Sequence, residues 1–207
     1  MKRWYEELRR GDHAAHIYRS DAEQVRVVTD TVSWMGEDQR LVMLSDRWDT
    51  ETKASRPRVL DAAVEDGHLI VVPAKPLLCR SGQFQAGALQ EYIDVELDGL
   101  TRPELVIMWD LDWLGADPDA FEAHIVQLSS MALAPPIHGV TLIGQYGTAF
   151  YTAEQVERIL RVNPLVLEGG MLARKFWVVS KSSVGKPSKD GHSLRVDVPE
   201  SAKVHEL

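Results

Sequence analysis

Two aspartates that follow a buried strand are the residues of this sequence best suited to carry chemistry. Residues 104–109 (ELVIMW) are almost wholly apolar and lead directly into Asp110 and Asp112. An aspartate at the end of such a strand has the form of a Walker B element, in which the carboxylate holds the magnesium ion of a bound nucleotide. Hydrolysis at such a site also requires a P-loop, G-x-x-x-x-G-K-S/T, after the first strand of the sheet.

The segment at the P-loop position lacks the residues that would hold a phosphate. The first expected strand, residues 14–18, continues as RSDAEQV, which contains neither glycine nor lysine. Glycine is needed there because backbone amides must approach the phosphate closely, and lysine is needed to reach it. Asp21 and Glu23 add negative charge instead. The sequence therefore argues against P-loop hydrolysis, and we expect a protein without catalytic residues that is not an enzyme.

Tryptophans beside the two aspartates offer a different chemistry, the wall of a ligand pocket. Trp109 and Trp113 flank the aspartates in WDLDW. Binding pockets combine aromatic walls with a few polar groups. The alternative is that Trp109 packs in the core and Trp113 shields the start of a helix, and both interpretations stay open, with Trp113 the better pocket residue. Glu122 and His124, on the helix that follows, are expected to face solvent.

A histidine pair near the N-terminus raises the question of a metal site. His13 and His16 are three residues apart, so on one strand they would point to opposite faces of the sheet. The sequence contains no C-x-x-C or H-x-x-x-H pair that would complete a metal site. We therefore expect no metal, with His16 in the strand and His13 in the preceding loop, hydrogen-bonded to the backbone.

Short apolar runs alternate with amphipathic stretches along the chain. The expected strands are residues 14–18, 40–44, 68–72, 104–109, 139–144 and 174–179. The expected helices are residues 21–35, 58–66, 83–98, 118–133 and 153–162, with N-caps at Ser20, Asp117 and Thr152. The polar stretch 45–58 is expected to be a loop.

This alternation predicts an α/β fold, a three-layer sandwich with a mostly parallel central sheet. Ligands bind such sheets at the carboxyl ends of the strands. The residues expected there are Tyr18, Arg19, Ser20, Asp21, Ser45, Asp46, Asp110, Asp112, Trp113, Gln145 and Tyr146.

Composition narrows the class of protein further. The 207 residues are 44% hydrophobic with a net charge of −8, and Cys79 is the single cysteine. A net negative chain is poorly suited to non-specific nucleic-acid binding, which depends on neutralising phosphates. No signal peptide or membrane span is visible, so we expect a cytoplasmic protein. We expect one domain over residues 1–180, and a polar linker and tail over 181–207 that either add one edge strand or are disordered.

Four stretches along residues 11–170 carry motifs in a consistent order. They are GDHAAHIYRSDAEQV (11–25), DGHLIVVPA with SGQFQAGAL (66–89), LDWLGADPDAFEAHIVQL (111–128) and LIGQYGTAF with ILRVNPLVLEGG (142–170). In order and spacing they resemble the MEDS domain, a sensory domain named for methanogens, methylotrophs and the dichloromethane-responsive repressor. The resemblance implies a degenerate relative of RecA/KaiC-type ATPases without a P-loop. It also implies a role in sensing small molecules, such as hydrocarbon or one-carbon derivatives, for transcriptional or kinase signalling.

The positions that match the motifs imply a ligand site. They are His13, Tyr18, Trp113, Glu122 and Tyr146.

Three positions depart from the motifs of this family. Gly144 stands where the family has cysteine, Gly147 where it has aspartate, and Asn163 where it has histidine. Whether the ligand contacts and thiol chemistry of that family are kept at these three points stays open.

Our first hypothesis is a non-catalytic sensory domain that binds a small molecule and acts through a signalling partner, a regulator or a kinase, with a homodimer also possible. The alternative is a RecA/KaiC-like protein that binds nucleotide or assembles without hydrolysis, and a third hypothesis is a purely structural interaction protein. The sequence names no cofactor and predicts no direct nucleic-acid or membrane partner. The candidate ligand-binding residues are His13, Tyr18, Asp110, Asp112, Trp113, Glu122 and Tyr146.

Overall fold

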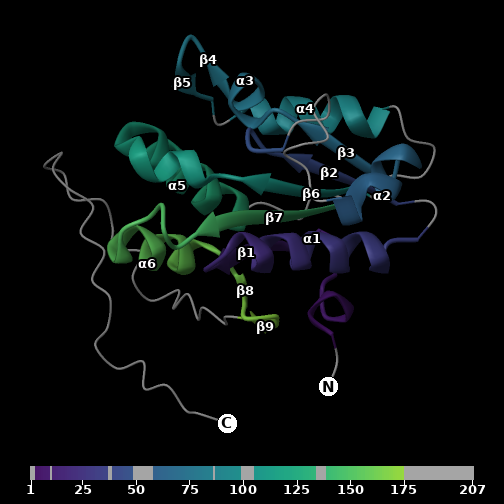
Figure 1. Cartoon of the computed structure of the whole chain (residues 1–207). Coiled ribbons are helices and arrows are strands. Elements are labelled where there is room, and N and C mark those ends of the chain that lie inside the picture. The colour runs from purple at the N-terminus through teal and green to yellow at the C-terminus, as the bar shows by residue number, and fades with distance from the viewer. Residues whose placement is uncertain are drawn as a thin grey trace, which may run out of the picture. The chain divides into compact units, whose positions relative to one another are not determined.

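A seven-stranded, mostly parallel sheet runs through the computed structural model of the chain (Figure 1). In spatial order its strands are β3 (Leu69–Val72), β2 (Arg40–Leu44), β6 (Leu105–Asp110), β7 (Val140–Gly147), β1 (His13–Tyr18), β8 (Leu165–Glu168) and β9 (Met171–Arg174). All neighbours are parallel except β8 and β9. The structure describes residues 3–9, 11–36, 39–48, 58–85, 87–98, 105–133 and 139–174.

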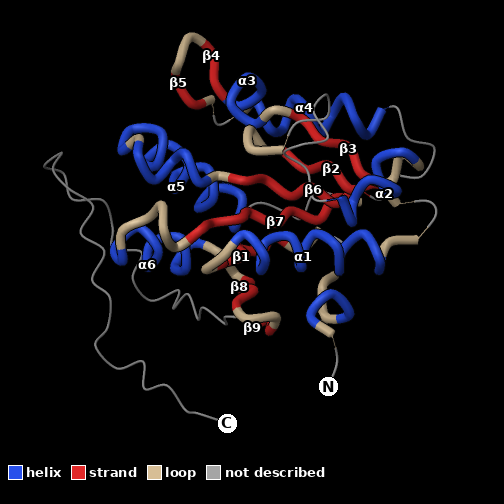
Figure 2. Tube along the Cα trace, in the orientation of Figure 1, coloured by secondary structure: helices blue, strands red, loops and turns tan. Residues whose placement is uncertain are grey.

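Helices cover both faces of this sheet, as Figures 1 and 2 show. One face carries α1 (Asp21–Trp34), α2 (Asp61–Glu65) and the short 3-10 turns Trp4–Glu6 and Arg58–Leu60. The other face carries α3 (Ala74–Leu78), α4 (Ala88–Asp98), α5 (Pro118–Leu133) and α6 (Ala153–Val162). The 3-10 turn η3 (Asp112–Ala116) joins β6 to α5. The predicted α/β sandwich with a mostly parallel sheet is therefore confirmed.

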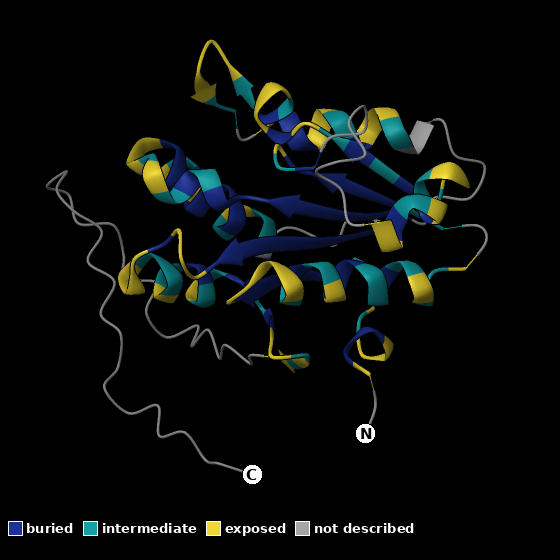
Figure 3. Ribbon diagram, viewed as in Figure 1, coloured by how far each residue is buried: buried dark blue, intermediate teal, exposed yellow. Residues whose placement is uncertain are grey.

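The central strands divide their side chains between two cores. On β6, Ile107 and Trp109 pack toward α4 and α5, while Val106 and Met108 pack toward α1. This alternation follows from the two-residue period of a strand. It also explains why the strand is apolar throughout, and why Figure 3 shows the central strands buried along their length.

The predicted N-caps hold the starts of three helices. Ser20 Oγ accepts a hydrogen bond from the backbone N–H of Glu23 at 3.3 Å. Asp117 Oδ1 accepts from the N–H of Ala120 at 3.0 Å, and Thr152 forms a reciprocal capping box with Gln155. Each such cap contributes about 1 kcal/mol by satisfying a free backbone N–H.

The predicted helix over residues 83–98 is wrong at its start. The helix begins at Ala88, and Gln83–Phe84 (β5) instead pairs antiparallel with Cys79–Arg80 (β4) in a short hairpin. The turn between the strands lies at Ser81 and Gly82, where φ is 53° and 77°. Two successive positive φ angles are typical of a type I′ turn, so the Ser-Gly pair forms a hairpin rather than a helical turn.

A second hairpin, β8–β9, was absent from the predicted elements. It turns at Gly169 and Gly170, where φ is 57° and 80°, and it places β9 at the edge of the sheet. The strand expected at residues 174–179 lies outside the described residues except for its first position, and so does the predicted tail at 181–207. None of the described helices is both long enough and apolar enough to span a bilayer.

Candidate functional site

Parallel strands bring several of the predicted residues to one edge of the sheet. Tyr18 ends β1, Asp110 ends β6 and Gly147 ends β7, and Ser45 follows β2. These strands are neighbours in the order β2-β6-β7-β1. Only residues 19 and 20 join β1 to α1, so the connection where a P-loop would lie is a tight turn.

A network of ion pairs and hydrogen bonds lies at this edge. We name it the strand-end cluster, and its members are Tyr18, Arg47, Asp110 and Asp112. Arg47 Nε donates to Asp110 Oδ2 at 2.9 Å, and a second guanidinium nitrogen lies 3.6 Å from Asp112 Oδ2. Ser45 Oγ also donates to Asp110, at 3.0 Å. The aspartates are 3% and 6% exposed. A guanidinium therefore supplies the positive charge beside Asp110 that magnesium would supply at a Walker B site.

Asp112 is held from two other sides. The Tyr18 hydroxyl donates to one of its oxygens, and the backbone N–H of Gly147 donates to Oδ1 at 2.7 Å. Burial, together with the charge of Asp110, raises the pKa of Asp112 to about 6 against the effect of these hydrogen bonds and of Arg47.

Arg47 is the central residue of this cluster. Burial lowers the pKa of Arg47, but Asp110, Tyr18 and Asp112 together outweigh burial and raise that pKa above its usual value. Arg47 also donates to Tyr18 at 3.2 Å, to Asp21 at 3.1 Å and to the side chain of Gln24. The polar atoms of the strand-end cluster thus bind to one another.

A second group of chemically capable side chains lies on the opposite face of the same strands. His13, Trp109, His124 and Tyr146, which we name the inner aromatic cluster, are at most 9% exposed. His124 Nε2 lies 2.9 Å from the Tyr146 hydroxyl. The ring of Trp109 packs edge-on against His124, with centroids 5.3 Å apart, and lies 6.5 Å from the ring of His13.

Polar atoms in this inner cluster lack partners. Both ring nitrogens of His13 lack a hydrogen-bond partner among the described residues, and so does the Nε1 of Trp109. Burial lowers the pKa of His13 to about 4. Burial and the nearby His13 lower the pKa of His124 to about 3, against a smaller opposite effect of the Gln127 side chain. Both histidines are therefore neutral at pH 7.

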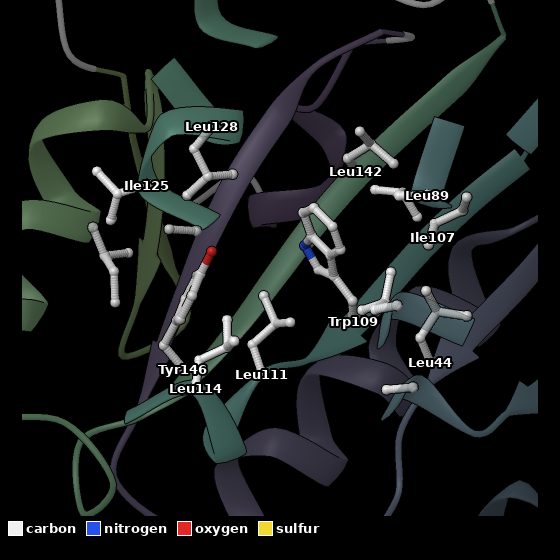
Figure 4. Close-up of a cluster of buried hydrophobic side chains, with 14 of the residues drawn as sticks. Leu44, Leu89, Ile107, Trp109, Leu111, Leu114, Ile125, Leu128, Leu142 and Tyr146 are labelled. Atoms are coloured by element: carbon white, nitrogen blue, oxygen red, sulfur yellow. The ribbon is translucent and has the colours of Figure 1, made fainter. Parts of the chain in front are cut away.

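Gly144 of β7 lies against two polar atoms of this cluster, the Tyr146 hydroxyl and Trp109 Nε1. A Cβ on Gly144 would lie 2.6 Å from the Tyr146 hydroxyl and 2.9 Å from Trp109 Nε1. Figure 4 shows Trp109 with its indole nitrogen on the side of the ring that faces Tyr146. Gly144 therefore packs tightly against a hydroxyl and an indole nitrogen, and any larger residue there would require one of the two rings to shift.

Gly147, where the MEDS resemblance predicts aspartate, packs tightly in the strand-end cluster. A Cβ there would lie 2.9 Å from Phe150 and 3.0 Å from both Asp112 and Tyr18. An aspartate at this position would also bring a third carboxylate toward Asp110 and Asp112. The strand-end cluster requires glycine here.

The structure divides the predicted site residues among several places. Tyr18, Asp110 and Asp112 lie in the strand-end cluster, and His13 and Tyr146 lie in the inner aromatic cluster. Trp113 is half-buried between the Lys75 amine, 5.4 Å from its ring centre, and the Phe84 ring at 6.3 Å.

Glu122 lies apart from both clusters. It is exposed and pairs with Arg158, whose hydrogen bonds and charge lower the pKa of that carboxyl.

The two histidine predictions need correction. His124 was expected to face solvent, but it is fully buried because it lies on the same face of α5 as Phe121, Ile125 and Leu128. That periodicity was visible in the sequence. His13 was expected in a loop, but pairing with Leu142 of β7 extends β1 to include it. His16 does lie on the other face, with its ring 5.6 Å from that of Tyr18.

Sequence reasoning also missed Arg47, which lies in the polar stretch predicted as a loop. Its main partner, Asp110, is 63 positions away, so no local pattern indicates the pair. Within the described part of the chain, no three His, Cys, Asp or Glu side chains are grouped as metal ligands.

Comparison with known proteins adds little to this site. No protein-family model matches the chain, and no curated protein matches it either. One similar solved structure is EccC of Thermomonospora curvata (ATPases 2 and 3), in complex with a signal sequence peptide. The similarity covers 76% of this chain and 30% of that chain, at 14% identity and a TM-score of 0.38. This chain therefore spans less than a third of that protein's chain.

Proposed function

We propose that this chain is a non-catalytic domain that binds a small molecule and passes the signal to a partner protein. The observation that carries this proposal is that nitrogens of His13 and Trp109, in the inner aromatic cluster, lack partners among the described residues. The Trp109 nitrogen lies beside Gly144. The nature of the partner, a transcription regulator or a kinase, follows from the MEDS resemblance alone.

Unpartnered buried groups are the physical basis of the argument. A buried donor without an acceptor costs about 1–3 kcal/mol, so most such groups in folded proteins are paired. A ligand that accepts a hydrogen bond from Trp109 would remove part of that cost, and its affinity would include the gain. Trp113, His16 and Trp4 also have nitrogens without a partner among the described residues. Trp113 lies in η3 beside Lys75 and Phe84, and His16 and Trp4 lie on the α1 face.

The strand-end cluster is the weaker candidate for a ligand site. Its two aspartates are already paired with Arg47, Ser45, Tyr18 and Gly147. The alternative of nucleotide binding would require Arg47 to leave Asp110 before a magnesium ion enters. Arg47 therefore favours the sensory proposal over the nucleotide-binding one.

A thermal-shift screen with matched histidine variants tests the proposal. The panel contains small alcohols and ketones, one-carbon and halogenated compounds, corrinoids, divalent metals, and ATP and GTP with magnesium. A ligand present at about a hundred times its Kd adds roughly 2.7 kcal/mol of stability. We expect His13→Phe to abolish the shift from a small-molecule hit and His16→Phe, on the opposite face, to retain it.

Two results would contradict the proposal. A small-molecule shift that survives in His13→Phe would place the ligand elsewhere. A shift with magnesium nucleotide alone, lost in Asp110→Asn, would establish the nucleotide-binding alternative.

A further inference from the structure

A groove between α4 and α5 lies beside the inner aromatic cluster. Its volume is about 330 Å³, within the range of small-molecule sites. Apolar side chains supply most of its wall, and none of the described residues that line it is charged. The residues that matter here are Leu89, Ile93, Val126, Gln127, Ser130 and Met131.

Gln127 connects this groove to the inner cluster. Its side chain is 8% exposed and lines the groove, and it lies one turn along α5 from His124, whose pKa it raises. His124 in turn contacts the Tyr146 hydroxyl at 2.9 Å, and Tyr146 lies against Gly144. Leu89, another lining residue, belongs to the same buried cluster as Trp109 (Figure 4). A polar path and an apolar wall therefore lead from the groove toward Gly144.

The chemistry along this path selects the class of ligand. The indole N–H of Trp109 only donates, so its partner must be an acceptor such as an oxygen atom. A charged head group would meet neutral histidines and uncharged walls, and an unpaired charge in such a site is far more costly than a neutral polar group. The apolar lining favours a short hydrocarbon body.

We propose that the α4–α5 groove binds the hydrocarbon body of a small neutral molecule, whose oxygen atom reaches the inner aromatic cluster past Gln127. The proposal rests on the proposed sensory function and adds to it the entry site and the ligand class.

Four probes of equal chain length test the ligand class: hexan-1-ol, hexan-2-one, hexanoate and hexylammonium. Each is titrated into the whole chain while thermal stability and the indole N–H signals of its six tryptophans are followed by NMR. We expect the two neutral probes to raise the melting temperature and to move one indole signal, which Trp109→Phe removes. The two charged probes should do neither.

Two exposed valines provide a matched test of the groove. Val126 lines the groove and is 64% exposed, whereas Val95, on α4, does not line it and is 71% exposed. We expect Val126→Trp to raise the Kd of the neutral probes by about tenfold or more, because the indole fills space that the hydrocarbon body would occupy. Val95→Trp should leave that Kd unchanged.

The outcomes separate this proposal from the proposed function. If Val126→Trp and Val95→Trp bind the neutral probes equally well, the groove is not the entry site. Tighter binding of a charged probe would overturn the ligand class. If the four probes fail but another small molecule of the panel binds and requires His13, the groove proposal fails and the sensory proposal stands. If nothing in either set binds, both proposals fail.

Discussion

Trp109 and Asp110 are neighbours in the sequence, yet their side chains enter opposite faces of the sheet and environments of opposite character. Asp110 is paired with Arg47 and Ser45, within a cluster whose polar atoms bind one another. Trp109 keeps an indole nitrogen without a partner, next to a histidine in the same condition. The comparison indicates that the strand-end cluster stabilises the fold, whereas the inner aromatic cluster holds polar atoms without partners among the described residues, on which the proposed ligand site rests.

The largest effect should come from removing the cation of the strand-end cluster. Arg47→Met leaves two buried carboxylates without their counter-ion, so the free energy of unfolding should fall by about 3–5 kcal/mol. Chemical denaturation measures this change. Arg19→Met is the control, because Arg19 pairs with Glu168 at an exposed site and should change stability little. Equal effects of the two substitutions would show that the strand-end cluster is not structural.

The two clusters should respond to pH in opposite directions. The pKa of Asp112 is raised to about 6, mainly by burial, so the folded state holds a proton that the unfolded chain has released. Its contribution to stability is present below pH 4 and is lost as the pH rises through 6. The pKa of His13 is lowered to about 4 by burial, so its contribution is present above pH 6.5 and is lost as the pH falls through 4.

Matched variants separate the two slopes between pH 4 and pH 6. Each group contributes at most about 1.4 kcal/mol per pH unit. In the parent chain, Asp112 makes the free energy of unfolding fall as the pH rises from 4 to 6, and Asp112→Asn should remove this contribution. His13 makes the free energy of unfolding rise over the same range, and His13→Phe should remove that contribution. Slopes of the same sign would contradict the different environments of the two clusters.

Each cluster packs against one glycine, and a side chain at that glycine would disturb the packing. Gly144→Ala places a Cβ at 2.6 Å from the Tyr146 hydroxyl, so stability should fall by about 1–3 kcal/mol through overpacking. Gly147→Ala meets its nearest atom at 2.9 Å and should cost somewhat less. Gly36→Ala is the control, because no atom of the described residues lies within 4 Å of its Cβ position. Thermal melts of the three variants give the order, and a neutral Gly144→Ala would show that the inner cluster is loosely packed.

The smallest effect has the opposite sign. His13→Phe replaces an unpartnered imidazole with an apolar ring of similar shape, so the ligand-free protein should gain about 1 kcal/mol of stability. Urea denaturation without ligand measures this gain, and His13→Leu controls for the larger volume of phenylalanine. Loss of stability in both variants would mean that His13 has polar partners in the folded protein.

The fold was largely predictable because its signals are local. Apolar runs such as 104–109 and caps such as Ser20 and Thr152 depend on neighbouring residues, and both are where the sequence places them. The β8–β9 hairpin was missed, although the two strand-like runs on either side of Gly169 and Gly170 are a local signal that could have indicated it.

The candidate site was only partly predictable, because its pairings are distant in sequence. Asp110 was expected at a strand end, but its partner Arg47 follows a different strand. The sequence placed Asp110 and Tyr146 in one site, although they face opposite sides of the sheet. That separation depends on strand register, since β6 and β7 align Trp109 with Gly144, and apolar patterns alone do not determine register in strands buried on both faces.

Complete burial of the inner aromatic cluster has a consequence for timing. A molecule that reaches Trp109 and Gly144 enters and leaves only when the packing around α4 and α5 opens, which is a motion of microseconds to seconds in proteins. The rate of ligand exchange would then be set by the rate at which the packing opens rather than by diffusion. The apparent affinity for the ligand would fall as the protein spends a larger fraction of its time closed. A sensor built in this way averages the concentration of its ligand over time and responds to sustained exposure more than to brief pulses.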